Sequence, residues 1–112
     1  MNTAMKVQDI SIEIIIKEKI QYAESNLNSE ESEDYMYMIQ GEIAAYHEIL
    51  EDIRDHSVKK FVKKYIKIVN KTHNNIENNI NLNENRVAWM SGYNNAIVDV
   101  LKLIHPSYEF GV

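Results

Sequence analysis

Apolar residues recur every three or four positions along most of the chain, which is the spacing of one face of an α-helix. The pattern is clearest from residue 89 to residue 104, where polar side chains occupy the opposite face. The apolar arc of this segment consists of Trp89, Tyr93, Ala96, Ile97, Val100, Leu101 and Ile104. We expect the helix to end at His105, because the ring of Pro106 disfavours helical geometry at the residue before it.

Three further amphipathic segments precede this one, and candidate N-caps separate them. Asn28 with Ser29 precedes the second segment, Ser57 the third and Asn83 the fourth. These signals predict one all-α domain over residues 1–112, with helices at about 7–27, 30–55, 58–80 and 84–104 and a tail at 105–112. The second helix is expected to bury Tyr35, Met38, Ile39, Ala45, Tyr46, Ile49, Leu50 and Ile53, and the third Phe61, Val62, Tyr65, Ile66, Ile68, Val69 and Ile76.

The first segment is open to a second interpretation. Between residues 7 and 16, isoleucines alternate with other residues in a pattern that also suits a β-strand, which could pair between two protomers. The helical spacing of Ile12, Ile16, Ile20 and Ala23 continues beyond this run. The longer pattern therefore favours a helix.

The second and fourth helices resemble each other at a constant spacing. Met38, Gly41, Ala45, Glu48, Ile49, Leu50 and Ile53 match Trp89, Gly92, Ala96, Asp99, Val100, Leu101 and Ile104, 51 residues later. In each copy a glycine and an alanine lie one turn apart, which would let two helices approach closely. Short connections between long helices predict a four-helix bundle or two packed antiparallel hairpins. The repeat suggests an internal duplication, although two amphipathic helices can also resemble each other by chance.

The composition is that of a folded helical protein, with 45% apolar and 26% charged residues and a single proline. The chain has no cysteine, which excludes disulfides and thiolate chemistry and leads us to expect a cytoplasmic protein. Its longest apolar run is too short to span a membrane, and the N-terminus lacks a signal-peptide pattern. We therefore expect no membrane association.

Two charges interrupt the apolar arcs of the first and second helices. Lys19 lies among apolar residues of the first helix, and Glu42 lies at the centre of the second. An isolated buried charge is costly, so we expect Lys19 and Glu42 to form a buried charge pair across the hairpin. A contact with a second protomer and a catalytic acid are the alternatives. As a structural pair, the two would make Glu42→Gln lower the melting temperature.

Metal and catalytic signals are weak. His47 with Glu51, and Asp52 with His56, have a chelating spacing, but no second helix supplies a matching cluster. No nucleophile constellation or glycine-rich phosphate loop stands out. We therefore expect no cofactor, no metal and no enzymatic activity. Metal-dependent hydrolysis by Glu48, Glu51 and Asp52 is the enzyme alternative.

The net charge of -5 argues against binding of nucleic acid by the whole surface, but the third helix carries a concentrated basic stripe. The stripe consists of Lys59, Lys60, Lys63, Lys64, Lys67 and Lys71 on the face opposite the apolar arc. It could track phosphates, hold a nucleotide, meet an acidic partner, or be a solvated face alone. For an apolar protein interface, the candidate exposed aromatics are Tyr37, Tyr108 and Phe110.

The segments Gly41-x-x-x-Ala45-Tyr46-x-x-Ile49-Leu50 and Gly92-Tyr93-Asn94-x-Ala96-Ile97-x-Asp99-Val100-Leu101 resemble helices in short, mostly uncharacterised proteins of low-GC Gram-positive bacteria and their phages. The bias towards asparagine, lysine and isoleucine is similar to theirs. The resemblance implies a small phage or mobile-element-type protein that binds and regulates or inhibits a host protein, with anti-defence as one such role. We expect such an interaction protein to self-associate. Binding of nucleic acid or a nucleotide through the lysine stripe is the alternative.

Overall fold

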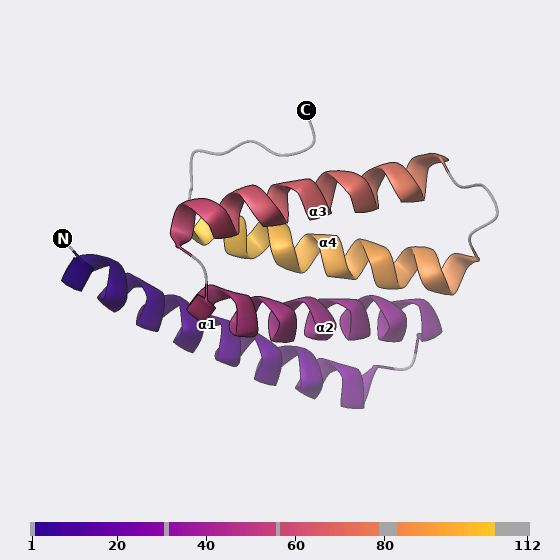
Figure 1. The fold of residues 1–112 in the computed structure, drawn as a ribbon. Helices are drawn as coiled ribbons and strands as arrows, with labels where there is room; N and C mark the ends of the chain where they lie inside the picture. The colour runs from indigo at the N-terminus through magenta and orange to yellow at the C-terminus, as the bar shows by residue number, and fades with distance from the viewer. Residues whose placement is uncertain (1, 31, 56, 79–82, 105–112) are drawn as a thin grey trace.

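The computed structural model describes residues 2–30, 32–55, 57–78 and 83–104, with side chains from Ile12 onward. Within these ranges the chain forms the helices α1 (Asn2–Ser29), α2 (Glu33–Asp55), α3 (Val58–Asn78) and α4 (Glu84–Ile104), and no strand (Figure 1). The all-α prediction is confirmed. The segment 7–16, which also suited a strand, is helical within α1.

Two of the predicted N-caps form as expected. The Ser57 hydroxyl accepts a hydrogen bond from the Lys60 amide at 3.3 Å, and the Asn83 side-chain oxygen accepts one from the Arg86 amide at 2.7 Å. Each side chain thus satisfies one of the amides that the first turn of a helix leaves unpaired.

The boundary between α1 and α2 lies later than the sequence indicates. The Ser29 hydroxyl donates to the carbonyl of Ser25 at 3.3 Å, so Ser29 belongs to the last turn of α1 instead of capping α2. The Met36 amide donates to the Ser32 carbonyl at 3.0 Å, and α2 begins at Glu33 where residue 30 was expected. Asn28 and Ser29 look like an N-cap in sequence because both residue types are preferred at that position.

The four helices form two antiparallel hairpins that pack through their second members. Figure 1 shows the order α1, α2, α4, α3 across the molecule, with α2 and α4 side by side and running in the same direction. The contact between α2 and α4 is the most extensive, whereas α2 and α3 barely touch. This arrangement selects the packed hairpins over an up-and-down bundle, in which α2 would neighbour α3.

The core follows the predicted apolar arcs. Isoleucines of α1 and aromatic residues of α3 close the two flanks of the α2–α4 layer. The buried side chains are Ile12, Ile16, Ile20, Ala23, Ala45, Tyr46, Ile49, Ile53, Phe61, Tyr65, Val69, Ala96, Ile97, Val100 and Leu101.

Gly41 and Gly92 make the closest approach between α2 and α4. A Cβ atom on Gly41 would overlap the backbone carbonyl of Trp89, and a Cβ atom on Gly92 would overlap the backbone carbonyl of Met38. The two contacts are reciprocal, since Trp89 and Met38 each lie one turn before the glycine of their own helix. The close approach predicted for these glycines is confirmed. Its approximate two-fold symmetry agrees with an internal duplication.

We predict that Gly41→Ala and Gly92→Ala each lower the free energy of unfolding by about 2 kcal/mol or more, because the added methyl group meets backbone that cannot move aside. Alanine in an unconstrained helix would instead stabilise by up to about 1 kcal/mol. Urea denaturation measures the difference, with Asn95→Ala at an exposed position of α4 as the control. A glycine variant as stable as the wild type would contradict the packing described here.

Candidate functional site

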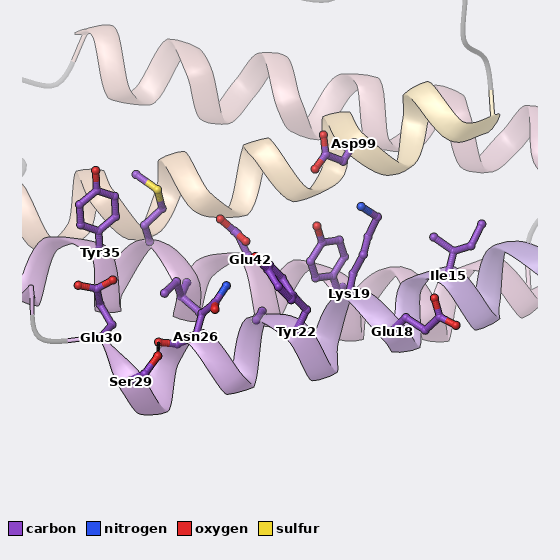
Figure 2. A pocket seen from close by; sticks show the side chains of 14 residues that line it. Ile15, Glu18, Lys19, Tyr22, Asn26, Ser29, Glu30, Tyr35, Glu42 and Asp99 are labelled. Atoms are coloured by element: carbon purple, nitrogen blue, oxygen red, sulfur yellow. Dashed lines mark hydrogen bonds between the residues drawn. The ribbon is translucent and has the colours of Figure 1, made fainter.

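A groove runs along the outer hairpin, between α1 and α2, and has a volume of about 720 Å³. Figure 2 shows Ile15 and Glu18 at one end of the groove and Ser29, Glu30 and Tyr35 at the other. Asp99 reaches its edge from α4. The lining from Ile15 to Ser29 of α1 corresponds to about 21 Å of helix. The groove is therefore long enough to take an extended or helical segment.

Lys19 and Glu42, the predicted buried charge pair, both line this groove. Each is half-buried, so neither is enclosed as the sequence indicated. Among the described residues the two form no direct ion pair, although the Lys19 ammonium does act on the Glu42 carboxylate through space. Above them the groove is open, because none of the four described helices covers α1 and α2 on this side.

The carboxylate of Asp99 on α4 interacts with that of Glu42 on α2, on the groove side of the α2–α4 layer. Burial is the main cause that raises the pKa of Glu42, Asp99 raises it further, and Lys19 opposes both. Figure 2 shows Glu42 and Asp99 directed into the same space between α2 and α4, with the Lys19 amine nearby. Burial, Asp99 and Glu42 together raise the pKa of Tyr46 above its usual value. The groove is thus an environment that disfavours further negative charge.

Two tyrosines that line the groove are strongly exposed. Tyr22 and Tyr35 have exposed fractions of 72% and 57%, among the largest apolar exposures in the described chain. Tyr35 was expected in the buried arc of α2, and this is wrong. Tyr35 lies in the first turn of α2, at the end of the α1–α2 hairpin, and its side chain is exposed there.

The opposite side of the α2–α4 layer faces α3 and holds a smaller hollow of about 380 Å³. Here the Tyr65 hydroxyl donates to Asp52 at 2.6 Å, and Lys64 forms an ion pair with the same carboxylate at 2.6 Å. The Tyr93 hydroxyl donates to Glu48. Burial, followed by these hydrogen bonds, raises the pKa of both Tyr65 and Tyr93 above the usual range. The chain's own donors therefore pair with Glu48 and Asp52 on this side.

The lysine stripe lies on the outer face of α3. Its members Lys59, Lys60, Lys63, Lys64, Lys67 and Lys71 are all exposed, as predicted from their spacing. Lys64 is also engaged with Asp52 and lies 5.6 Å from the centre of the Tyr65 ring. The stripe is thus an exposed basic face of α3, which lies at the opposite end of the helix order from α1 (Figure 1).

The predicted aromatic contacts are placed differently. Tyr37 is half-buried and lines a hollow of about 360 Å³ with Arg86 and Trp89, away from the α1–α2 groove. Tyr108 and Phe110 lie outside the described residues. The exposed aromatics of the groove, Tyr22 and Tyr35, were missed because helical periodicity alone does not show where a layer ends.

Metal-ligating side chains are scattered over the part of the chain that the structure describes. No group of three or more histidine, aspartate or glutamate side chains there converges to hold a metal ion. Glu48, Glu51 and Asp52 do line one hollow, but they share it with Lys64, Tyr65 and Tyr93. No described helix is both long enough and apolar enough to cross a membrane.

Asp99 is another residue of the candidate site that the periodicity of a single helix could not identify. On its own helix it belongs to the polar face. The signal that could have found it is the 51-residue repeat, which aligns Asp99 with Glu48 and Tyr93 with Glu42. When α2 and α4 pack together, the repeat relates the contact between Tyr93 and Glu48 to a contact between Glu42 and Asp99.

Comparisons with protein-family models, with curated proteins and with solved structures found no match for this chain.

We predict that Glu42→Gln raises the melting temperature near neutral pH, the reverse of what the charge-pair interpretation of the sequence implies. Because its pKa is raised above 4.5 in the fold, Glu42 holds a proton that the unfolded chain has already lost, and the wild type loses stability as pH rises through this window. Glutamine removes that loss. Below the window both states carry the proton, and the advantage of the variant should vanish.

Thermal melts of both proteins from about pH 4 to about pH 8 measure this difference. The advantage of Glu42→Gln should be largest at the alkaline end. A wild type that is more stable at neutral pH would show that attraction to Lys19 outweighs burial and Asp99.

Proposed function

We propose that this protein is a small helical interaction module that binds a partner protein along the α1–α2 groove and so regulates or inhibits it. The observation that carries the proposal is the open groove, with Tyr22 and Tyr35 exposed along it. Tyrosine offers a large, rather rigid apolar surface with a polar tip, and it is enriched among residues that contribute most to protein interfaces. Large exposed aromatic residues beside a groove commonly mark such interfaces.

The shape of the groove supports a polypeptide as the bound species. Its lining extends over about four turns of α1, which is the length of a short helix laid into a groove. Met38, Ile39 and Ile15 supply apolar contacts, and the charged residues lie between them. This alternation suits one face of an amphipathic segment. The resemblance to small phage proteins suggests a host protein as the partner. The predicted self-association stays a prediction.

A second candidate function is binding of nucleic acid or a nucleotide through the lysine stripe. All six lysines are exposed on one face, and Glu77 near the end of α3 is the one acidic residue in that helix. The overall charge of -5 and the ion pair between Lys64 and Asp52 both weaken this candidate. We therefore rank it second.

Affinity capture from a Gram-positive host lysate, treated with nuclease in one arm, tests the two functions together. We expect one host protein to be retained in stoichiometric amount by the wild type and by Lys63→Glu/Lys67→Glu. Tyr22→Ala/Tyr35→Ala should retain at least about ten-fold less, since aromatic anchors at interfaces are often worth 2 kcal/mol or more. Both tyrosines are exposed, so the variant should keep the wild-type circular dichroism and melting temperature.

Retention that is unchanged in Tyr22→Ala/Tyr35→Ala would contradict binding through the groove. Retention of nucleic acid that is lost in Lys63→Glu/Lys67→Glu would instead establish the second candidate function.

A further inference from the structure

The two sides of the α2–α4 layer are related by the internal repeat, which allows a matched comparison. The 51-residue spacing makes Glu42 the counterpart of Tyr93, and Glu48 the counterpart of Asp99. The helices α2 and α4 contact each other reciprocally at Gly41 and Gly92. Residues related by the repeat therefore occupy similar positions on opposite sides of the layer. Any difference in chemistry between the sides therefore comes from the side chains.

On the side facing α3, donors of the chain pair with two of the acids of α2. Tyr93 donates its hydroxyl hydrogen to Glu48, and Lys64 and Tyr65 both contact Asp52. Phenol and ammonium donors thus lie next to carboxylate acceptors, which makes these hydrogen bonds charge-assisted.

On the side facing α1 the repeat substitutes an acid for the phenol donor. Glu42 occupies the position in α2 that corresponds to Tyr93 in α4. Two carboxylates, those of Glu42 and Asp99, therefore repel each other on the groove side of the layer. Among the described residues that line the groove, Lys19 is the one basic residue, whereas Glu18, Glu42 and Asp99 are acidic. The groove is open, exposes two tyrosine side chains, and brings the carboxylates of Glu42 and Asp99 together beside a single ammonium group.

We propose that the α1–α2 groove binds a basic amphipathic segment of the partner protein, with a lysine or arginine side chain seated between Glu42 and Asp99. This inference rests on the proposed function and specifies the chemistry of the partner. The carboxylates complement a cationic side chain, and Tyr22 and Tyr35 offer ring faces to other cations of the same segment. Ile15, Met38 and Ile39 accept the apolar residues of the same segment.

A second copy of this chain fits the groove less well, although the lysine stripe has the opposite charge. The large hydrophobic side chains that are exposed in the described chain are Ile14, Tyr22, Tyr35 and Leu103, and none of these lies on α3. The outer face of α3 would thus bring charge without apolar contact. Exposed ion pairs alone contribute little to affinity, because solvent and salt screen them.

A defined peptide tests the inference without knowledge of the natural partner. The probe is an amphipathic lysine and leucine peptide of about 14 residues, matched to the length of the groove, and the control peptide carries glutamate in place of lysine. The full chain, labelled with ¹⁵N, is titrated with each peptide. We expect the lysine peptide alone to shift backbone amide resonances, and we expect those shifts to be concentrated at groove residues such as Lys19, Tyr22 and Glu42.

Two double variants, each of which removes two negative charges, distinguish a specific binding position from long-range electrostatic attraction. Glu42→Gln/Asp99→Asn removes two carboxylates at the groove, and Glu48→Gln/Glu51→Gln removes two on the side facing α3. The first should weaken binding of the lysine peptide at least about ten-fold, the effect of losing a charge-assisted contact. The second should change it less than about two-fold, since it alters only long-range charge.

Equal weakening by both variants, no binding at all, or binding of the glutamate peptide would overturn the inference. So would groove resonances that shift on dilution of the protein alone and stop shifting in Lys63→Glu/Lys67→Glu, because a second copy would then be the occupant. The proposed function fails separately. If partner capture still depends on Tyr22 and Tyr35 while the lysine peptide does not bind, the interaction function stands and only the basic chemistry of the partner is wrong.

Discussion

The contact on which the rest of the structure depends is the backbone approach of α2 and α4 at Gly41 and Gly92. Side chains larger than hydrogen cannot occupy these positions without moving one helix away from the other. With α2 and α4 joined in the same direction, the antiparallel partners α1 and α3 must lie on the outside (Figure 1). A single steric requirement at two glycines thus sets both the helix order and the position of the two surfaces that carry charge.

Those surfaces share a framework but differ in chemistry. On the side facing α3, Tyr93 and Tyr65 donate hydrogen bonds to acids of α2. The side facing α1 has Glu42 in the position that corresponds to Tyr93, and its carboxylates remain next to an open groove. The charge of Glu42 is unfavourable in the fold, as its raised pKa indicates. A partner that brings a positive charge would relieve that cost on binding, and this links stability to the proposed interaction.

Much of this fold could be predicted from the sequence. Periodicity located the helices and nearly all of the core, and the paired small residues indicated the close approach. Periodicity describes one helix at a time, however, and cannot say which helices are neighbours. The exposure of Tyr22 and Tyr35 and the meeting of Glu42 with Asp99 both depend on that choice. The same limitation made Lys19 and Glu42 look like an enclosed pair, when the groove leaves both half-exposed.

The most direct test of the account is a nuclear Overhauser measurement at the crossing of α2 and α4. We expect cross-peaks between the α protons of Gly41 and the amide proton of Tyr93, and between the α protons of Gly92 and the α proton of Met38. The structure brings these backbone atoms close together. Absence of these cross-peaks, with contacts between α2 and α3 along their length, would contradict it. That result would indicate an up-and-down bundle, in which neither the α1–α2 groove nor the hollow facing α3 would have the lining residues described above.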